Sequence, residues 1–492
     1  MAGGAAAEPV RRAPERFSGL LVVAVVAILV TAVATIGWMW FRTITFPYPV
    51  DYGEGPLLNH ALRIASAQPA YPMPGSEPPW IVLNYGPVYP ALNAGLSLLF
   101  GPAFWYGRLL SALGALAAAL FAGLIVHTIT EDRAASVITA LLMPVVPCLA
   151  YWAALARVDL VALAASLAGV WCVVRRPGST RWLVAGAVLM VLAACTRQSY
   201  LLAAPLTATV WLWPLGRRRA VAFAGTVIGS VLVLWAIATL ATRGAFWFNT
   251  ITANVNELYL ELLAWYAEGI VWTTPVLLAV LLVAPVVTIA TRQPSARLLV
   301  PYTAAALVVF GTAGKVGSSL NYLLELGTAS CLAAGLLLAA VRPRPVWRAV
   351  VVIALLAQSL YLLLVPHPYY GLLHRVVDNR VVAERIAAVV SDSSGPVLAD
   401  EDSGYLPVTG HSIELQPFEL SQLSYAGLWD QTPLLDAIRQ HRYAVILIYE
   451  NDDSLEEYRW TPEMLSAVRR SYAAVEIISR GEDGRTVVYR PR

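Results

Sequence analysis

Residues 19–55 read GLLVVAVVAILVTAVATIGWMWFRTITFPYPVDYGEG, a long apolar run followed by a short acidic segment. A helix needs about 20 consecutive apolar residues to cross the hydrocarbon core of a bilayer. The part from Gly19 to Trp40 meets this requirement, and Asp51 and Glu54 follow soon after it. This stretch therefore predicts a membrane-spanning helix with two carboxylates just beyond one of its ends.

The rest of the chain has the same apolar character. Of its 492 residues 58% are hydrophobic and only 13% are charged, and the mean hydropathy is +0.64. Soluble domains carry about 25% charged residues. Disordered chains contain fewer apolar residues than soluble domains do. Four cysteines in this length also exclude a disulfide-stabilised scaffold. The composition thus indicates a polytopic α-helical membrane protein.

Apolar segments of helical length predict about eleven spans within residues 19–365. The stretch 85–100 is apolar but short and contains two prolines, so we expect a helix at the membrane interface there. The predicted spans lie near 19–40, 104–127, 134–153, 159–174, 182–195, 199–215, 220–241, 270–290, 298–313, 321–340 and 349–364.

Arginines outside the spans predict the orientation, because cytoplasmic loops are enriched in Lys and Arg. With eleven spans, the arginines before the first span and in every second loop fall on one face. Residues 1–18 are therefore predicted to be cytoplasmic and the C-terminus external. The arginines concerned are Arg11, Arg12, Arg16, Arg133, Arg175, Arg176, Arg181, Arg217, Arg218, Arg219, Arg292, Arg297, Arg342, Arg344 and Arg348.

Residues 366–492, called the tail below, differ from the rest and hold 19 acidic against 12 basic side chains. Helical segments near 379–390, 433–441 and 461–470 alternate with short apolar strands at 397–399, 443–449, 473–479 and 485–489. We therefore expect a small extracytoplasmic α/β domain. Its Asp400-Glu401-Asp402 run, with His411 nearby, could mark a metal or catalytic site, but without a second fixed set of ligands we expect a solvated loop.

Four cations lie on the predicted external face, where the orientation rule disfavours them. Arg197 occupies the turn of a predicted helical hairpin, and Lys315, the one lysine of the chain, lies in a glycine-rich connection. Cations that converge on one face suit an anionic ligand such as a lipid phosphate. The alternative is that they snorkel to lipid headgroups. The four are Arg157, Arg197, Arg243 and Lys315.

The first external loop, residues 41–103, carries the two carboxylates at its start. Asp51 and Glu54 lie on one side of the segment if it is helical, because they are three residues apart. Tyr85 and Tyr89 follow in an aromatic, proline-rich stretch, and tyrosines suit both the membrane interface and the faces of sugars. Asp159 either forms a local ion pair with the nearby Arg157 or takes part directly in a reaction.

Together these segments resemble the GT-C glycosyltransferases of the protein mannosyltransferase and aminoarabinose transferase type. The resemblance covers roughly residues 15–365 and depends on the order and spacing of the motifs on a consistent topology. The family's frequent Arg-Tyr-Leu-Leu-Pro lacks its arginine here, and Lys315 is expected to replace that cation. The matching segments are Asp51 and Glu54, Tyr85-Gly86-Pro87-Val88-Tyr89-Pro90, Tyr106-Gly107-Arg108-Leu109-Leu110-Ser111, Arg157-Val158-Asp159, Thr196-Arg197-Gln198 and Asn321-Tyr322-Leu323-Leu324-Glu325.

The resemblance implies a polyprenyl-phosphate-linked sugar donor, an acceptor hydroxyl that enters from outside, and a single inverting displacement. Asp51 is then favoured as the catalytic base over Glu54, which would orient the acceptor or help to hold a divalent cation. Cations would stabilise the phosphate that leaves. The substrate-binding residues implied are Tyr85, Tyr89, Arg157, Asp159, Arg197, Lys315 and Tyr322.

Two other kinds of function are alternatives. A transporter or flippase of lipid-linked sugars usually has ionisable groups near the bilayer midplane and paired interrupted helices, whereas the unusual charges here lie at span ends. A sensor or assembly protein would use the tail to bind a partner. The acceptor is left open between glycan, lipid and protein, and we expect membrane lipids but no nucleic acid as partners. The arginine- and alanine-rich composition points to a bacterial plasma membrane.

Overall fold

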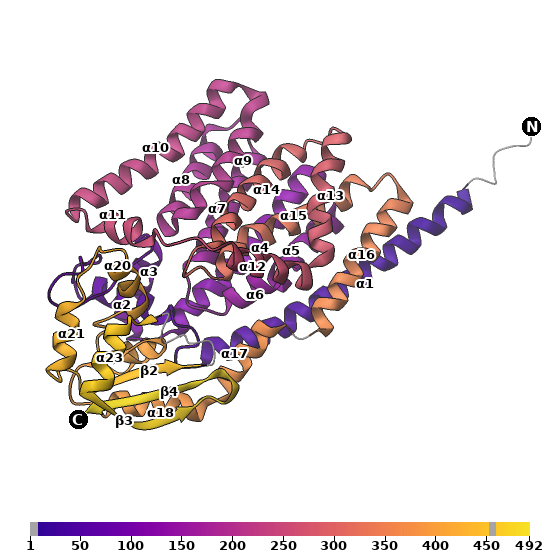
Figure 1. The fold of residues 1–492 in the computed structure, drawn as a ribbon. Coiled ribbons are helices and arrows are strands. Elements are labelled where there is room, and N and C mark those ends of the chain that lie inside the picture. The colour runs from indigo at the N-terminus through magenta and orange to yellow at the C-terminus, as the bar shows by residue number, and fades with distance from the viewer. Residues whose placement is uncertain (1–7, 366, 452–458) are drawn as a thin grey trace, which may run out of the picture.

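The computed structural model describes residues 8–365, 367–451 and 459–492. A bundle of helices forms one end of the molecule, and a small sheet with its own helices covers the other end (Figure 1). The 38-residue helix α1 (Glu8–Thr45) runs along the edge of the bundle. Its C-terminal end reaches the sheet, while its N-terminal end extends away on the opposite side (Figure 1). The tail and the start of α1 thus lie at opposite ends of the bundle.

Every predicted apolar segment forms helix, but three are interrupted. In two of them a sharp bend separates two helices. The bend is 62° between α5 (Arg133–Leu142) and α6 (Pro147–Ala153), and 97° between α12 (Leu260–Thr273) and α13 (Pro275–Ala290). The third, α9, is flanked on both sides by short 3-10 turns. The other helices of the bundle and its loops are α2 (Glu54–Ala65), α3 (Val88–Phe100), α4 (Trp105–Thr130), α5 (Arg133–Leu142), α6 (Pro147–Ala153), α7 (Asp159–Arg175), α8 (Thr180–Thr196), α9 (Ala203–Leu212), α10 (Arg217–Ala241), α11 (Ala245–Thr250), α12 (Leu260–Thr273), α13 (Pro275–Ala290), α14 (Ala296–Gly311), α15 (Leu324–Ala340) and α16 (Pro345–Leu364).

Judged by their length, fewer helices are able to cross a membrane than the sequence predicts. Six helices in the described part of the chain are long and apolar enough to cross a membrane, and up to eight if each bent pair is one span. Helices α7 and α8 have 17 residues each and α9 has 10. At 1.5 Å per residue these reach at most about 26 Å, less than the hydrocarbon core of about 30 Å. The count of eleven therefore stays a prediction.

Helix α15 forms the centre of the bundle. Of its most apolar window 83% is buried, against 22% for both α1 and α10, whose leucine- and valine-rich surfaces face outward. Close packing at the centre requires small residues. A side chain at Gly335 of α15 would lie 2.0 Å from the hydroxyl oxygen of Thr139 on α5. In the same way, Gly114 of α4 touches the backbone of α7.

Helix α3 matches the interfacial helix that the sequence predicts. It has 13 residues, too few to cross a bilayer. Leu98, Leu99 and Phe100 at its C-terminal end are exposed, while Tyr89 and Asn93 face inward. This one-sided distribution suits a helix that lies along the surface of the membrane.

The tail contains the four strands that the sequence predicts, in one sheet of order β1-β2-β4-β3. β1 and β2 are parallel, and the other neighbouring pairs are antiparallel. The elements are α17 (Pro368–Asp378), α18 (Arg380–Ser391), β1 (Val397–Ala399), α19 (Tyr405–Val408), α20 (Pro417–Tyr425), α21 (Thr432–Arg439), β2 (Val445–Glu450), α23 (Pro462–Ser471), β3 (Tyr472–Ser479) and β4 (Arg485–Pro491).

The first external loop packs into the core of the tail. Trp80 is buried against Trp429, and its backbone N–H and C=O pair with Glu414 and Gln416 as a short parallel bridge. The backbone N–H of Val82 donates to the Gln416 side chain at 2.6 Å. Loop and tail therefore share one apolar core and one set of backbone hydrogen bonds, and the loop is held at the sheet end of the molecule.

A glycine contact fixes how closely the tail approaches α2. A Cβ on Gly55 would lie 2.5 Å from the Cα of Gly404. We predict that Gly55→Ala lowers the unfolding temperature of the detergent-solubilised protein and exposes the tail to protease, at a cost of about 1–3 kcal/mol. Gly95→Ala in α3 is the matched control, because a Cβ there meets nothing within 4 Å. Equal behaviour of the two variants would contradict this close packing.

Candidate active site

A buried ion pair holds the start of the first external loop. Both oxygens of Glu54 accept from Arg108 of α4, at 2.8 and 2.7 Å, and neither side chain has any exposed surface. The other N–H groups of Arg108 donate to three carbonyl oxygens at the end of α1, those of Thr43, Phe46 and Tyr48. All five donors of the guanidinium are therefore used. This network ties the loop to α1, α2 and α4.

Glu54 also accepts from the protein backbone. The N–H of Val50 donates to it at 3.0 Å, and the N–H of Ala156 donates at 2.8 Å. Burial by itself would raise the pKa of Glu54, but Arg108 and these two N–H groups outweigh it and lower the pKa. Glu54 is thus an ionised structural group, joined to the segments on which Asp51 and Arg157 lie.

Asp51 lies one turn before Glu54 and remains accessible. Its Oδ1 accepts from the backbone N–H of Gly53 at 3.0 Å and from the guanidinium of Arg157. Gly53 permits this approach, because a Cβ there would overlap the guanidinium of Arg157. Burial raises the pKa of Asp51, and Arg157 opposes the effect. Its Oδ2 has no hydrogen-bond partner among the described residues, so it is open to a ligand.

A second ion pair lies beside the first. Asp159, at the start of α7, accepts from Arg197, and its other oxygen accepts from the indole N–H of Trp152 at 2.7 Å. The Trp152 ring in turn lies 5.2 Å from the guanidinium carbon of Arg157. Asp159 is fully buried and connects the two arginines through this tryptophan. The local pair of Arg157 with Asp159, one of the two alternatives for these residues, does not form, and each of them pairs instead with a residue of another segment.

Two tyrosines enclose Arg197. Its guanidinium carbon is 5.7 Å from the ring centre of Tyr85 and 5.3 Å from that of Tyr322, within the range of cation–π attraction. The same Tyr322 ring lies 6.0 Å from the Nζ of Lys315. Lys315 donates to the backbone oxygen of Asn254 at 3.0 Å, and no carboxylate among the described residues pairs with it. It is therefore the cavity cation best able to bind an added anion.

Asp51, Arg197 and Lys315 line one cavity of about 430 Å³. Its walls come from the first loop, the α8–α9 turn, the segment between α11 and α12, the Lys315 turn and the tail. Seven carboxamide side chains contribute, which both donate and accept hydrogen bonds as sugar hydroxyls do. They are Asn84, Gln198, Asn254, Asn256, Asn321, Gln416 and Gln422.

Several buried polar atoms of this lining have no hydrogen-bond partner among the described residues. Buried polar groups are almost always paired in folded proteins, so a cluster of unpaired ones indicates where a polar ligand or water binds. The atoms are His60 Nε2, Asn84 Oδ1, Arg157 Nε, Asn321 Oδ1, Gln416 Nε2 and Arg459 Nη1.

The structure brings most of the predicted site residues together, but not all of them. Asp51, Tyr85, Arg157, Arg197, Lys315 and Tyr322 line the cavity. Asp159 lies behind Arg197, without surface of its own in the cavity. Glu54 and Tyr89 do not line it: Glu54 faces Arg108, and Tyr89 donates to the backbone oxygen of Gly107 at 2.9 Å. Arg243 is exposed at the end of α10, outside the cavity.

The tail contributes residues that the sequence did not reveal. Phe418, Glu419 and Arg459 line the cavity, and the hydroxyl of Tyr52 donates to Glu419 at 2.7 Å. The expectation that Asp400-Glu401-Asp402 forms a solvated loop is wrong, since Asp400 and Asp402 are 0% and 1% exposed. A run of acids looks solvated in sequence, because its arginine and tryptophan partners are far along the chain.

The side chains around Asp51 do not fit a bound divalent cation. Both Glu54 oxygens are already used by Arg108 and by backbone N–H groups, and one Asp51 oxygen faces Arg157. Within the described ranges, no three His, Cys, Asp or Glu side chains come close enough to share a metal ion. We therefore derive no step through a metal.

The assignment of Glu54 as a structural group leads to a prediction. Glu54→Gln leaves Arg108 charged, buried and partly unpaired, which costs about 3–5 kcal/mol. We expect a lowered unfolding temperature in detergent, and the same for Arg108→Met. Arg380→Gln, which breaks the exposed Arg380–Glu384 pair, should leave that temperature unchanged. A Glu54→Gln protein with normal stability and no activity would instead place Glu54 in the chemistry.

Comparisons with known proteins agree with the architecture. No protein-family model and no curated protein sequence matches the chain. Among solved structures it is similar to ArnT from Cupriavidus metallidurans, both in the apo state and bound to undecaprenyl phosphate. Each of these matches has a TM-score of 0.57 and 14% identity, and covers 94% of this chain and 97% of that chain.

An archaeal enzyme shares the same architecture. The oligosaccharyltransferase of Archaeoglobus fulgidus, in a complex with Zn and sulfate, matches with a TM-score of 0.53 and 12% identity, over 94% of this chain and 73% of that one. The fold of this chain is therefore similar to that of ArnT and of this oligosaccharyltransferase.

Proposed function

We propose that this chain is a membrane glycosyltransferase that moves a sugar from a polyprenyl-phosphate donor to an acceptor hydroxyl. One observation carries the proposal: Asp51, with an oxygen open to a ligand, and Lys315, without a carboxylate partner among the described residues, line the same cavity. A displacement at the anomeric carbon needs a base for the acceptor and a cation for the leaving phosphate. The fold shared with ArnT, solved with undecaprenyl phosphate bound, supports the lipid-linked donor.

Asp51 is the proposed base. Its Oδ2 takes the proton of the acceptor hydroxyl while the hydroxyl oxygen forms a bond to the anomeric carbon. Arg157 and the N–H of Gly53 hold Oδ1, which fixes the direction of the carboxylate. Because burial raises the pKa of Asp51, its carboxylate is a stronger base than an exposed aspartate.

Lys315 and Arg197 are the proposed phosphate ligands. As the bond from the anomeric carbon to the phosphate oxygen breaks, the polyprenyl phosphate leaves with an added negative charge. Lys315 meets this charge directly, and Arg197, held between Tyr85 and Tyr322, adds a second cation. Attack and departure in one step invert the anomeric centre.

The carboxamide wall supports a sugar as the transferred group. Asn and Gln side chains provide donors and acceptors without charge, which suits several hydroxyls of one ring. We place the site at the external face of a bacterial plasma membrane, with residues 1–18 cytoplasmic, 19–365 in the membrane module and 366–492 outside. A flippase is not favoured, because the charged groups gather in one cavity at the sheet end of the bundle.

Removing the base should stop transfer. We expect Asp51→Asn to lower the rate about 10²–10⁴-fold, the usual contribution of a general base, with little effect on stability. The assay follows radiolabel from the polyprenyl-phosphate fraction of membranes into the acceptor. Asp436→Asn, at an exposed ion pair of α21, is the control and should transfer normally. Full activity of Asp51→Asn would remove Asp51 from the mechanism.

Removing the cation of Lys315 should weaken the binding of the donor. Lys315→Met loses a charge-assisted hydrogen bond of about 1.5–3 kcal/mol, so we expect the donor KM to rise roughly ten- to hundredfold. Protection from thermal unfolding by undecaprenyl phosphate should fall in parallel. Arg243→Met removes an exposed cation outside the cavity and should change neither quantity. Equal donor affinity in both variants would exclude Lys315 from the phosphate site.

A further inference from the structure

Asp51 lies between two cavities. Besides the main cavity it lines a second one of about 160 Å³ on the side of the tail. Glu401, Asp402 and Arg480 of the tail also line this second cavity. Carboxylates of the tail thus face the residue that the proposed function uses as a base.

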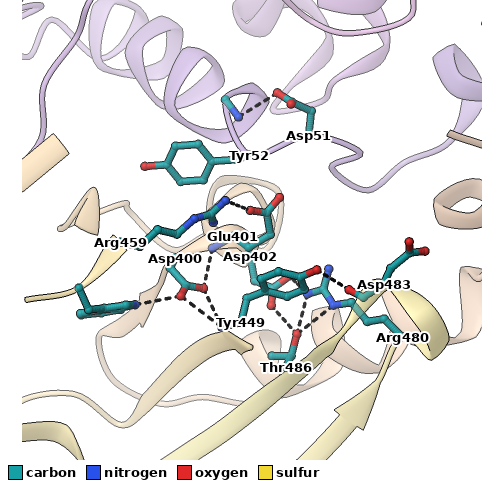
Figure 2. A network of polar contacts seen from close by, with 12 residues as sticks. Asp51, Tyr52, Asp400, Glu401, Asp402, Tyr449, Arg459, Arg480, Asp483 and Thr486 are labelled. Carbon is teal, nitrogen blue, oxygen red and sulfur yellow. Dashed lines mark hydrogen bonds and ion pairs between the residues drawn. The ribbon is translucent and has the colours of Figure 1, made fainter. Parts of the chain in front are cut away.

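An ion pair of the tail lies against Tyr52, the residue that follows Asp51. Glu401 pairs with Arg459, and the guanidinium carbon of Arg459 lies 4.8 Å from the ring centre of Tyr52. Figure 2 shows Arg459 and Glu401 joined beneath Tyr52, with Asp400 on the far side of the pair. Arg459 lines the main cavity and Glu401 the second one, so the pair bridges the two.

Hydrogen bonds within the tail fix the position of this ion pair. Asp400 accepts from the indole N–H of Trp460 at 2.9 Å, and from the backbone N–H groups of Tyr449 and Glu401 at 3.0 and 2.6 Å. Glu401 and Arg459 are each adjacent in sequence to a partner in this network (Figure 2). Their positions therefore depend on the fold of the tail rather than on the membrane helices.

The other charges around Asp51 are neutralised by partners of their own. On the membrane side, Arg157 pairs with Asp51 itself, and Glu54 is paired with Arg108. Tyr151 on α6 also lines the second cavity, together with Asp51.

On the tail side, Asp402 pairs with Arg480, and Glu419 accepts from Tyr52. Burial raises the pKa of Asp51 most, Arg157 opposes this, and Glu54 and Glu401 raise it further. Glu401 thus shares the second cavity with Asp51 and raises its pKa, and Arg459 is the counterion of Glu401.

We propose that Glu401 and Arg459 are positioning residues for the catalytic loop: Arg459 holds Tyr52, and the balance of the two charges sets the pH range in which Asp51 accepts a proton. This inference rests on the proposed function, in which Asp51 is the base. It makes the tail part of the active site rather than a cover over it.

The pH dependence of transfer tests the proposal. Glu401→Gln removes a negative charge and should move the acidic limb of the rate profile to lower pH. Arg459→Gln leaves Glu401 without its counterion and should move it to higher pH. At protein dielectric each shift should be roughly 0.5–1 pH unit. The acidic limb of the double variant should lie between those of the two single variants. In Arg459→Lys, which keeps the charge, the limb should stay near its wild-type pH. Lower rates with no shift of the limb would overturn the proposal.

A thiol in place of the carboxylate gives a readout that needs no activity. In Asp51→Cys, the rate of alkylation by iodoacetamide against pH reports the pKa of the introduced thiol. The four native cysteines are buried, so the label is specific. Glu401→Gln should lower this pKa and Arg459→Gln should raise it. An unchanged thiol pKa in both backgrounds would also overturn the proposal.

The two experiments separate the inference from the proposed function. If the thiol pKa shifts as expected while the unaltered protein transfers no sugar, the electrostatic coupling holds and the proposed function fails. If transfer occurs and neither profile moves, the inference fails alone. Arg385→Gln and Glu476→Gln are the matched controls, since they break a similar ion pair of the tail on α18 and β3 and should shift neither profile.

Discussion

The buried ion pair of Glu54 and Arg108 is the interaction on which the site depends. Two charges without exposed surface are costly unless every donor and acceptor is satisfied. Here all five guanidinium donors are used, and the carboxylate takes two further backbone N–H groups. Since the partners belong to α1, α2, α4 and the turn before α7, the pair joins all four at one point. Removing either charge leaves the other one buried without a partner of opposite charge.

The residues that line the cavity are arranged from that point outward. The N–H of Ala156 on Glu54 places the next residue, Arg157, against Asp51. Trp152 links this pair to the pair of Asp159 and Arg197, and Tyr322 connects Arg197 with Lys315. The result is a cavity lined by the carboxylate of Asp51 and by Lys315, which has no carboxylate partner in the described part of the chain. The proposed reaction needs both groups, a base for the acceptor hydroxyl and a cation for the leaving phosphate.

The tail completes the cavity through contacts over long sequence distances. Trp80 of the first loop lies in the tail's own core, and Tyr52 lies between Glu419 and Arg459. Figure 1 shows the tail closing the end of the bundle where α1 ends. The loop that bears Asp51 is thus held from two sides, by α4 of the bundle and by the tail. Neither part alone fixes the position of the carboxylate.

Local sequence patterns alone predict the helices, the strands of the tail and the candidate residues Asp51, Arg157, Arg197 and Lys315. Apolar runs and strand alternation are local patterns, and charges that oppose the orientation rule stand out without any structure. The folded structure was needed to show that Glu54 turns away while Asp51 faces the cavity, because a three-residue spacing does not say which carboxylate meets an arginine 54 positions further on. It also decided that the acidic run of the tail is buried and that Arg459 reaches Tyr52. The physical reason is the same in each case: the partner that settles a charge's role comes from a distant segment, and folding alone brings the two together.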